Sequence, residues 1–514
     1  MTVFAAPTED ILFSMRDVAA AGELPDWDDD LARDILTAFS AFAEGEIAPL
    51  DEAGDRQGCR LENGRVSMPD GFRAAYEKLA GMGWQGLTAP EDHGGMAQDP
   101  LIAALVSEVF SGANHAMQMV CNLVPGAMTT LLRFGTPAQQ AEWLPRLAGG
   151  AALSTMCLTE PGAGSDLSRI RTRATRSAQG WTLSGEKIFI SGGDQDLSDD
   201  ILHLILARTG DVADGIKGLS LFLSSRSAAG SAIKVTRIEE KLGLHASPTC
   251  HMVFDDAPCE LVGVEGEGLK AMFTLMNHAR LDVALQGVAH AARAHAIAAA
   301  YAADRKQGRR ADGRDAVLGD HPDVRRMLDK QRCLAMGARA MAHETLVEMV
   351  RGESPALVDF LTPVCKVFCS EAGTSSADLG IQILGGYGYL TEYRVGQTWR
   401  DARIASIYEG ANGIHALATA TRGLRIEAGA DAFDALIGRL TDDPRVLERR
   451  ELWRQARARV AASVAPAELA HDFMQLTAGL FYRAAWARIA RVGQSDELSR
   501  LADTVISPDR DWAA

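Results

Sequence analysis

The chain has 514 residues, of which 47% are hydrophobic and 23% charged, a composition typical of a soluble globular protein with several domains. Its formal net charge of −16 gives no electrostatic support for broad binding to nucleic acids or anionic membranes. Early acids and the lack of a basic segment before an apolar core argue against a secretory signal. We find no apolar run long enough to span a membrane. Eight scattered cysteines favour reduced thiols in a cytoplasmic protein, and their spacing predicts no metal site.

Helical periodicity dominates the chain up to about residue 147. Apolar residues recur at helical spacing over 28–42 and 99–110, and a Ser-Met-Pro sequence introduces another helix over 67–79. The Gly- and Pro-rich segment GWQGLTAPEDHGG predicts a loop between these helices. We therefore expect an N-terminal helical domain.

The pattern changes near residue 151, where segments with the alternation of strands begin. LSTMCLTE, WTLSGEKIFIS, ILHLILART, GLSLFLSS and AIKVTRI follow one another with turns between them, up to about residue 262. A β domain inserted in an otherwise helical chain is therefore the main architectural prediction.

Long helical segments return after the strands, over 268–305, 322–350 and 355–383, and their lengths predict a side-by-side bundle. Shorter helices are predicted after residue 422, over 432–440, 444–462 and 466–491. The arginines of 444–462 alternate with acids, which favours a solvated or inter-subunit face over a nucleic-acid site. The final residues, SPDRDWAA, predict a loose tail.

One carboxylate stands out in the stretch 382–422. The apolar run 404–407 leads to Glu409, directly before a helical pattern resumes. A single acid among apolar residues is costly to bury unless it has a task. The residues alone leave two interpretations open: a catalytic carboxylate, or an acid that favours the first turn of the next helix.

Two strand ends carry a second set of candidate residues. The first, MCLTEPGAGSD, ends in a turn whose small residues expose successive N–H groups to an anion such as pyrophosphate. It is not a Rossmann fingerprint, because no third glycine and no helix follow it. The second is GEKIFISGG. Together, Thr159, Phe189 and Ser191 predict hydrogen bonds and an aromatic wall for a flat ring system.

With these motifs the chain resembles the acyl-CoA dehydrogenase family. CLTEPGAGSDL, GEKIFIS, YAADRKQGR, QILGGYGY and IYEGANGI occur in the family's order and spacing, over about residues 30–425. KLGLHASPTCHMVFDDA, NHARLDVALQGV and HPDVRRML are most similar to the branch that contains 3-methylmercaptopropionyl-CoA dehydrogenase. The resemblance implies a mainly α fold with an N-terminal helical domain (1–150), a middle β-barrel-like domain (151–264), a C-terminal four-helix bundle (265–425) and a helical extension (426–514).

The resemblance also implies FAD, bound between the last two family domains and reaching a neighbouring subunit of a homodimer or a dimer of dimers. Positions that match cofactor contacts of the family are Met156, Leu158, Thr159, Gly164, Ser165, Phe189, Ser191, Arg305, Gln307, Gln382, Gly386, Ala411 and Gly413. Positions that match substrate contacts are Ser165, Asn277, Arg280, Tyr408 and Gly410. Glu409 matches the general base, and Ala279 stands where other branches place theirs, so Glu409 has no competitor.

The implied activity is the FAD-dependent α,β-dehydrogenation of an acyl-CoA thioester, with electrons passed to an electron-transfer flavoprotein. Glu409 would take the α-proton, and the β-hydride would go to flavin N5. The branch suggests 3-methylthiopropionyl-CoA, an intermediate of DMSP catabolism, and a short or medium fatty acyl-CoA stays open. The alternatives are an acyl-CoA oxidase on the same fold and a non-catalytic, family-like binding protein.

The chain also departs from the family pattern. Ala411-Asn412-Gly413 replaces the commoner Thr-Ser-Gln, so FAD binding is expected to depend more on Arg305 and Gln307. A family arginine near the CoA end falls on Thr421, with Arg422 beside it. We interpret the remaining histidines as structural, because this chemistry needs no second acid: His115, His245, His251 and His278.

Overall fold

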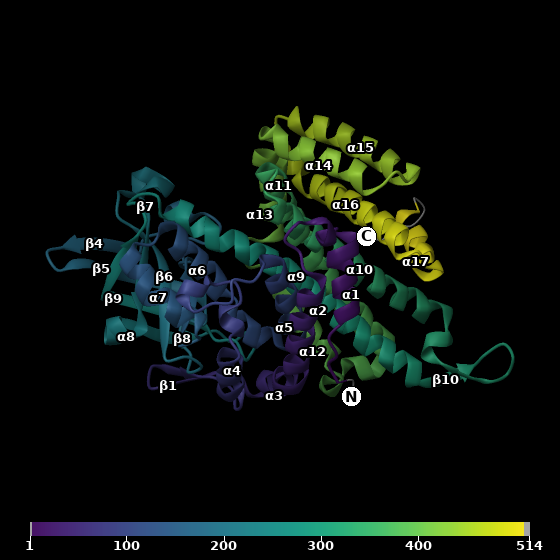
Figure 1. The fold of residues 1–514 in the computed structure, drawn as a ribbon, viewed down its shortest axis with the longest axis horizontal. Helices are drawn as coiled ribbons and strands as arrows, with labels where there is room; N and C mark the ends of the chain where they lie inside the picture. Colours follow the sequence, from purple (N-terminus) through teal and green to yellow (C-terminus); the bar gives the residue numbers. More distant parts are fainter. Residues whose placement is uncertain (1–2, 508–514) are drawn as a thin grey trace. The chain divides into compact units, whose positions relative to one another are not determined.

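The computed structural model describes residues 3–507, so the predicted loose tail lies outside the described residues from 508 onward (Figure 1). The chain divides into two compact units. One unit comprises 45–103 and 113–279, and the other comprises the described parts of 1–44, 104–112 and 280–514. Within residues 3–507, no helix is both long enough and apolar enough to cross a membrane.

The first unit is built around a seven-stranded sheet. Strand β6 pairs with β4, β4 with β5, β5 with β9, β9 with β7, and β7 with β6 again, so these pairings form a closed ring. Strand β3 runs parallel to β6, and β8 pairs with β9. The strands are β3 (Ala152–Cys157), β4 (Arg173–Ser177), β5 (Gly180–Ser191), β6 (Asp200–Arg208), β7 (Leu219–Ser225), β8 (Ile233–Ile238) and β9 (Thr249–Val262).

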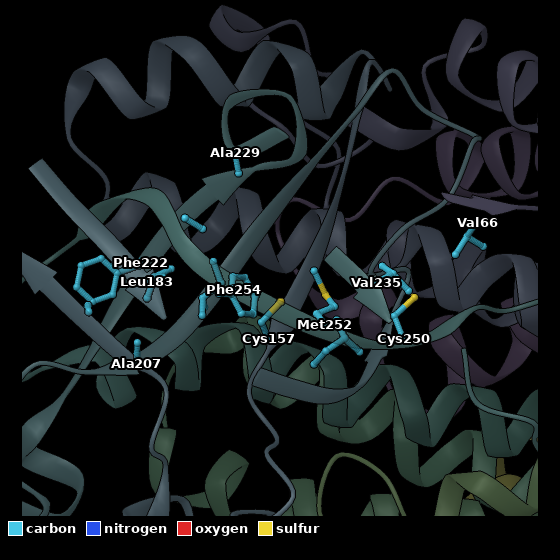
Figure 2. Close-up of a cluster of buried hydrophobic side chains, with 14 residues drawn as sticks. Val66, Cys157, Leu183, Ala207, Phe222, Ala229, Val235, Cys250, Met252 and Phe254 are labelled. Atoms are coloured by element: carbon cyan, nitrogen blue, oxygen red, sulfur yellow. The ribbon is translucent and has the colours of Figure 1, made fainter. Parts of the chain in front are cut away.

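Large apolar side chains fill the space enclosed by this ring of strands (Figure 2). Leu183, Phe222, Met252 and Phe254 are all at most 2% exposed. They come from β5, β7 and β9, where successive side chains alternate between the inside and the outside of the sheet. Each such side chain contributes roughly 1.5–3 kcal/mol of transfer free energy, so this core fixes the register of the strands.

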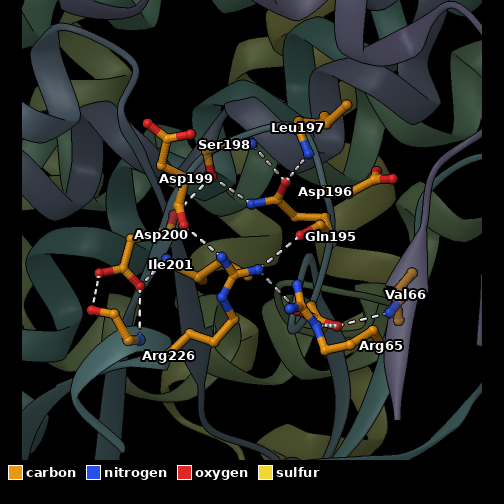
Figure 3. A network of polar contacts seen from close by, with 12 residues as sticks. Arg65, Val66, Gln195, Asp196, Leu197, Ser198, Asp199, Asp200, Ile201 and Arg226 are labelled. Atoms are coloured by element: carbon orange, nitrogen blue, oxygen red, sulfur yellow. Dashed lines mark hydrogen bonds and ion pairs between the residues drawn. The ribbon is translucent and has the colours of Figure 1, made fainter. Parts of the chain in front are cut away.

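A polar network holds the loop between β5 and β6 (Figure 3). The Asp194 carboxylate accepts from Arg65 Nε and from the backbone N–H of Val66, both at 2.8 Å, and it also pairs with Arg226. Arg65 and Val66 belong to the small hairpin β1 (Arg60–Glu62) and β2 (Arg65–Ser67). The hairpin therefore anchors the chain where it leaves the end of β5.

Helices complete this unit. They are α3 (Ala48–Gln57), α4 (Phe72–Gly81), α6 (Leu123–Phe134) and α7 (Pro137–Ala148). Helix α5 (Pro100–Cys121), with non-helical dihedral angles at Asn114, and α9 (Gly268–Asp304) contribute residues to both units.

The second unit is helical. Its main elements are α2 (Asp29–Phe42), α10 (Pro322–Arg351), α11 (Pro355–Leu384), α12 (Val395–Ala402), α13 (Asn412–Ala418), α14 (Glu427–Leu440), α15 (Pro444–Ala461), α16 (Ala470–Gly493) and α17 (Asp496–Ile506). A short hairpin, β10 (Lys306–Arg309) and β11 (Asp315–Val317), follows α9. The predicted mainly α fold with an inserted β domain is thus confirmed.

The C-terminal helices pack on the bundle at α10 and α11, where the green and yellow ribbons of Figure 1 meet. The Trp486 indole N–H on α16 donates to the Cys333 carbonyl on α10 at 3.1 Å. Arg450 and Arg454 of α15 both pair with Asp434 of α14. These two arginines therefore tie helices of the extension together.

Candidate active site

Glu409 lies in a short loop between the 3-10 turn Arg403–Ser406 and α13. Its φ of 54° is left-handed, and the following Gly410 has a φ of 94°. A left-handed non-glycine residue costs about 1–2 kcal/mol, and such strain tends to gather at functional sites. Helix α13 begins at Asn412 after Ala411, with no side-chain cap hydrogen bond. Glu409 therefore does not cap this helix.

Two buried basic side chains hold successive carbonyl groups of this loop. His415 Nε2 lies 3.0 Å from the Glu409 carbonyl oxygen, and Lys366 Nζ donates to the Gly410 carbonyl at 2.7 Å. Because a carbonyl only accepts, the Nε2 atom of His415 must carry the proton. Burial, with Lys366 and Arg280 nearby, lowers the pKa of His415 to about 4, so the ring is neutral at pH 7. The left-handed turn is thus fixed from both sides.

Burial raises the pKa of the Glu409 carboxyl to about 7, against the opposing effect of Arg280 and Lys366, while Asp282 raises it further. The residue keeps part of its surface open, yet surrounding protein atoms desolvate the carboxyl group. Among residues 3–507, none donates a hydrogen bond to this carboxylate, and no acceptor takes its backbone N–H. The result is a carboxylate with basicity near neutral pH and free hydrogen-bonding capacity.

The neighbouring Tyr408 is fixed by a chain of polar side chains. Its hydroxyl donates to Gln286, whose amide donates to Asp282 at 2.8 Å, and Ser107 donates to the same carboxylate. Burial raises the pKa of the Tyr408 hydroxyl, so it stays protonated as a donor. Arg280 lies on α9, one half-turn before Asp282. Burial lowers the pKa of Arg280, and the nearby Glu409 carboxylate opposes this lowering.

The two predicted strand ends lie together in the other unit. The Ile188 N–H donates to the Thr159 carbonyl at 2.9 Å, where the register of β5 against β9 shifts. Phe189, at this bulge, has a φ of 59° and is 59% exposed. The exposed ring beside this strand end offers a flat apolar surface.

The glycine-rich turn after β3 is open. A Cβ atom added at Gly162 or Gly164 would meet nothing within 4 Å. Buried Lys187 holds the base of the turn, since its Nζ donates to the Leu158 carbonyl at 2.8 Å and to Glu160 at 2.9 Å. Glu160 accepts the backbone N–H groups of residues 171 and 172 as well. The backbone of this turn is therefore held in place by Lys187 and Glu160, and it has open space beside Gly162 and Gly164.

A third group of predicted positions lies on the surface of the helical unit. The Arg305 guanidinium lies over the ring of Tyr387, 5.5 Å from its centroid. Tyr387 follows Gly386 directly, so Arg305 and the turn after α11 lie side by side. Arg305, Gln307, Gln382 and Gly386 are all exposed.

The predicted positions thus fall into three local groups. The turn beside β5 gathers Met156, Leu158, Thr159, Gly164, Ser165, Phe189 and Ser191. The loop before α13 and the start of that helix carry Tyr408, Glu409, Gly410, Ala411 and Gly413, and Arg280 of α9 lies near Glu409. The surface of the helical unit carries Arg305, Gln307, Gln382 and Gly386, of which Arg305 lies over Tyr387, the residue after Gly386. Asn277 and Ala279 lie on α9 in the β-containing unit.

Residue patterns did not identify several side chains that support these groups, namely Lys187, Gln286, Lys366 and His415. One signal was available for Lys366, which is a lone charge within the apolar segment TPVCKVFCS. A buried ammonium group in such a segment needs nearby acceptors, and that requirement is itself a pointer to a site.

Matches to three family models define the class of protein. Models of the N-terminal, middle and C-terminal domains of acyl-CoA dehydrogenases match residues 29–151, 155–257 and 266–424. The chain belongs to the acyl-CoA dehydrogenase family, and the prediction of an oxidoreductase of this family is confirmed.

A similar relative is the 3-methylmercaptopropionyl-CoA dehydrogenase of Ruegeria pomeroyi, 42% identical over 80% of this chain and 75% of the relative. Caenorhabditis elegans ACDH-11, solved in complex with C11-CoA, has a TM-score of 0.81 with 20% identity over 99% of this chain and 92% of its own. A Bacillus anthracis acyl-CoA dehydrogenase complexed with FAD has a TM-score of 0.77 with 22% identity, over 94% and 87% of the two chains. These two structures show a fold shared over nearly the whole chain.

Proposed function

We propose that this chain is an FAD-dependent acyl-CoA dehydrogenase in which Glu409 removes the α-proton of an acyl-CoA thioester. The observation that carries the proposal is the Glu409 carboxyl, which is held in a left-handed turn by His415 and Lys366 and accepts no hydrogen bond within residues 3–507. Burial raises its pKa to about 7. A general base works best when its pKa lies near the working pH. Glu409 is the one acid among the loop residues 407–411.

The same loop supplies a donor for the thioester. Abstraction of the α-proton places negative charge on the thioester oxygen, and a fixed donor beside that oxygen lowers the barrier. The Glu409 N–H, which no acceptor takes within residues 3–507, is our candidate for this donor. The left-handed turn held by His415 and Lys366 would keep N–H and carboxylate in one orientation.

The residues beside β5 fit a flavin. Open space above Gly162 and Gly164 leaves room for a phosphate group against the turn, and exposed Phe189 offers a wall for a ring. Met156, Leu158, Thr159, Ser165 and Ser191 would complete this side. When bound, FAD would supply the acceptor for the β-hydride, a role no side chain can fill.

We further propose a homodimer or a dimer of dimers. Arg305, Gln307, Gln382 and Gly386 are exposed in one chain, which suits a contact with the FAD of a neighbouring subunit. The domain boundaries at 150, 264 and 425 and the cytoplasmic location stay predictions.

The proposed substrate is 3-methylthiopropionyl-CoA, supported by the 42% identity to the Ruegeria pomeroyi enzyme. A short or medium fatty acyl-CoA is the second candidate, because one methylene changes discrimination by only about 1–3 kcal/mol. The proposed electron acceptor is an electron-transfer flavoprotein.

An anaerobic screen tests the proposal. Purified protein reconstituted with FAD is mixed with a panel of acyl-CoA thioesters that includes 3-methylthiopropionyl-CoA, and flavin bleaching is followed. We expect bleaching by at least one thioester and slow reoxidation in air. Fast reoxidation would favour an acyl-CoA oxidase, and protein that cannot retain FAD would favour a non-catalytic binding protein.

A further inference from the structure

We propose that Lys366 is a positioning residue for Glu409, acting by anchoring the turn at Gly410 and by keeping a fixed positive charge beside the carboxylate. Lys366 lies on α11, and its side chain is fully buried. The inference rests on the proposed role of Glu409 as the base, and it assigns the lysine a task that the base itself cannot perform.

The first argument is the cost of burying this lysine. Val364, Cys365 and Val367 around it are at most 2% exposed. Removing an ammonium group from water carries a large free-energy penalty, and burial lowers the pKa of Lys366 to about 8. The lysine is thus still mainly protonated at pH 7. A purely structural position would be filled more cheaply by an apolar side chain of the same volume.

The second argument is geometry. Lys366 Nζ donates to the Gly410 carbonyl at 2.7 Å and to Asn412 Oδ1 at 3.0 Å. Gly410 follows Glu409 in the loop and Asn412 is the first residue of α13, so the two acceptors lie one on each side of Ala411. A single ammonium group therefore clamps the loop where the backbone turns left-handed.

A third observation fixes the orientation of the clamp. The Asn412 amide nitrogen donates to Glu371 at 3.0 Å and to Ser370 at 3.2 Å, so its oxygen must face Lys366. Gln475 of α16 donates to the other Glu371 oxygen at 3.2 Å. The amide of Asn412 thus cannot rotate away without losing these bonds.

The fourth argument is electrostatic. Lys366 opposes the rise in the pKa of Glu409, and Glu409 opposes the fall in the pKa of Lys366. Removing the lysine charge would leave Arg280 as the counter-charge, and the pKa of Glu409 would rise further. The titratable and charged groups that face this pair are Arg280, Asp282, Glu371, Tyr408 and His415. Arg422 and Asp359 act in turn on Arg280.

The test compares Lys366→Met, which removes the charge and the donor, with Lys366→Arg, which keeps the charge. The rate of flavin reduction by a substrate thioester is measured from about pH 5.5 to 9. We expect Lys366→Met to lower this rate at pH 7 by about tenfold to a hundredfold, and to move the acid limb of the profile to higher pH. Lys366→Arg should keep the acid limb near that of the unchanged protein. Lys330→Met, at a half-buried lysine on α10, is the matched control.

A second readout needs no catalysis. The melting temperatures of Lys366→Met and of Lys366→Met with Glu409→Gln are compared across the same pH range. The difference between these two melting temperatures depends on the ionisation of Glu409. The pH midpoint of this dependence should lie above the pH midpoint measured for the same comparison with Lys366 present. If Lys366→Met does not fold, Lys366→Gln takes its place, because it removes the charge and keeps a donor.

An unchanged rate and an unchanged acid limb would overturn the inference. A lower rate or melting temperature with unmoved midpoints would also overturn it, since that pattern marks a merely structural lysine. These results differ from failure of the proposed function, which would appear as normal flavin reduction by Glu409→Gln with Lys366 intact.

Discussion

At the scale of single residues, the candidate site concentrates unfavourable features in one loop. Glu409 has a left-handed backbone and a carboxyl group with no hydrogen bond among residues 3–507, and the glycine after it cannot be replaced freely. A Cβ atom on Gly410 would lie 2.7 Å from Nε2 of His415. These costs are tolerated when the surrounding contacts impose one geometry, which is the usual condition of a preorganised site.

The stability of the protein should carry a signature of Glu409. Its pKa is about 7 in the folded chain and about 4.5 without perturbation. A raised carboxyl pKa favours the folded state below the unperturbed pKa, and this contribution is lost as pH rises through the folded pKa. The loss amounts to about 3 kcal/mol between the two values. Urea midpoints across this window should therefore fall with pH more steeply for the unchanged protein than for Glu409→Gln, and parallel curves would refute the raised pKa.

At the scale of elements, the loop 409–412 is supported by α11 and α13, and α11 is in turn contacted by α16 of the extension. Helix α16 approaches α10 closely at Gly337. A Cβ atom there would lie 2.2 Å from the Tyr482 ring and 2.6 Å from the Trp486 indole nitrogen. The extension thus packs on the bundle where a residue without a side chain allows it.

Gly337→Ala should loosen this contact. We expect a loss of about 1–3 kcal/mol, typical of overpacking, and faster proteolysis of the C-terminal helices. Gly396→Ala is the control, because a Cβ atom on that helical glycine would meet nothing within 4 Å. A control that is equally destabilised, or a Gly337→Ala variant as stable as the unchanged protein, would show that the close approach is unimportant.

Strongly periodic elements were predictable from the sequence. Helices α2, α10 and α11 end within one or two residues of the expected 28–42, 322–350 and 355–383. Helices α6 and α17 were not predicted, and α5 continues to Cys121 instead of ending near residue 110. In α5 the packed structure continues the helix across the irregular dihedral angles at Asn114, where local periodicity gives no warning.

The candidate site divides in the same way. Glu409 and the two strand ends could be predicted from the sequence, because each belongs to a motif of consecutive residues. Lys366 and Gln286 were not, because α11 and α9 bring them to the loop from more than 40 residues away. Only three-dimensional packing can place such a residue beside the carboxylate that it serves.

At the scale of the whole molecule, the proposal requires more than one chain. Exposed Arg305 lies over Tyr387 beside the turn that follows α11, so a second subunit could contact guanidinium and turn together. A partner's FAD at this place would link cofactor retention to assembly.

Arg305→Ala should weaken FAD retention and the dimer together. Loss of one charge-assisted hydrogen bond is worth about 1.5–3 kcal/mol, so FAD should dissociate at least about tenfold more readily. Flavin content after gel filtration and mass by sedimentation measure the two effects. Arg310→Ala, in the hairpin that directly follows Arg305 but paired with Asp320, is the control. Unchanged flavin content and mass would remove the argument for a shared cofactor site.

The most direct test of the central claim is the rate of anaerobic flavin reduction in Glu409→Gln. The account predicts that this variant keeps FAD and still binds acyl-CoA, but reduces its flavin about a thousandfold more slowly, because the positioned base is gone. Glu344→Gln is the matched control, since burial raises the pKa of that α10 glutamate to about 7 as well. Normal flavin reduction by Glu409→Gln would contradict the account and place the base elsewhere.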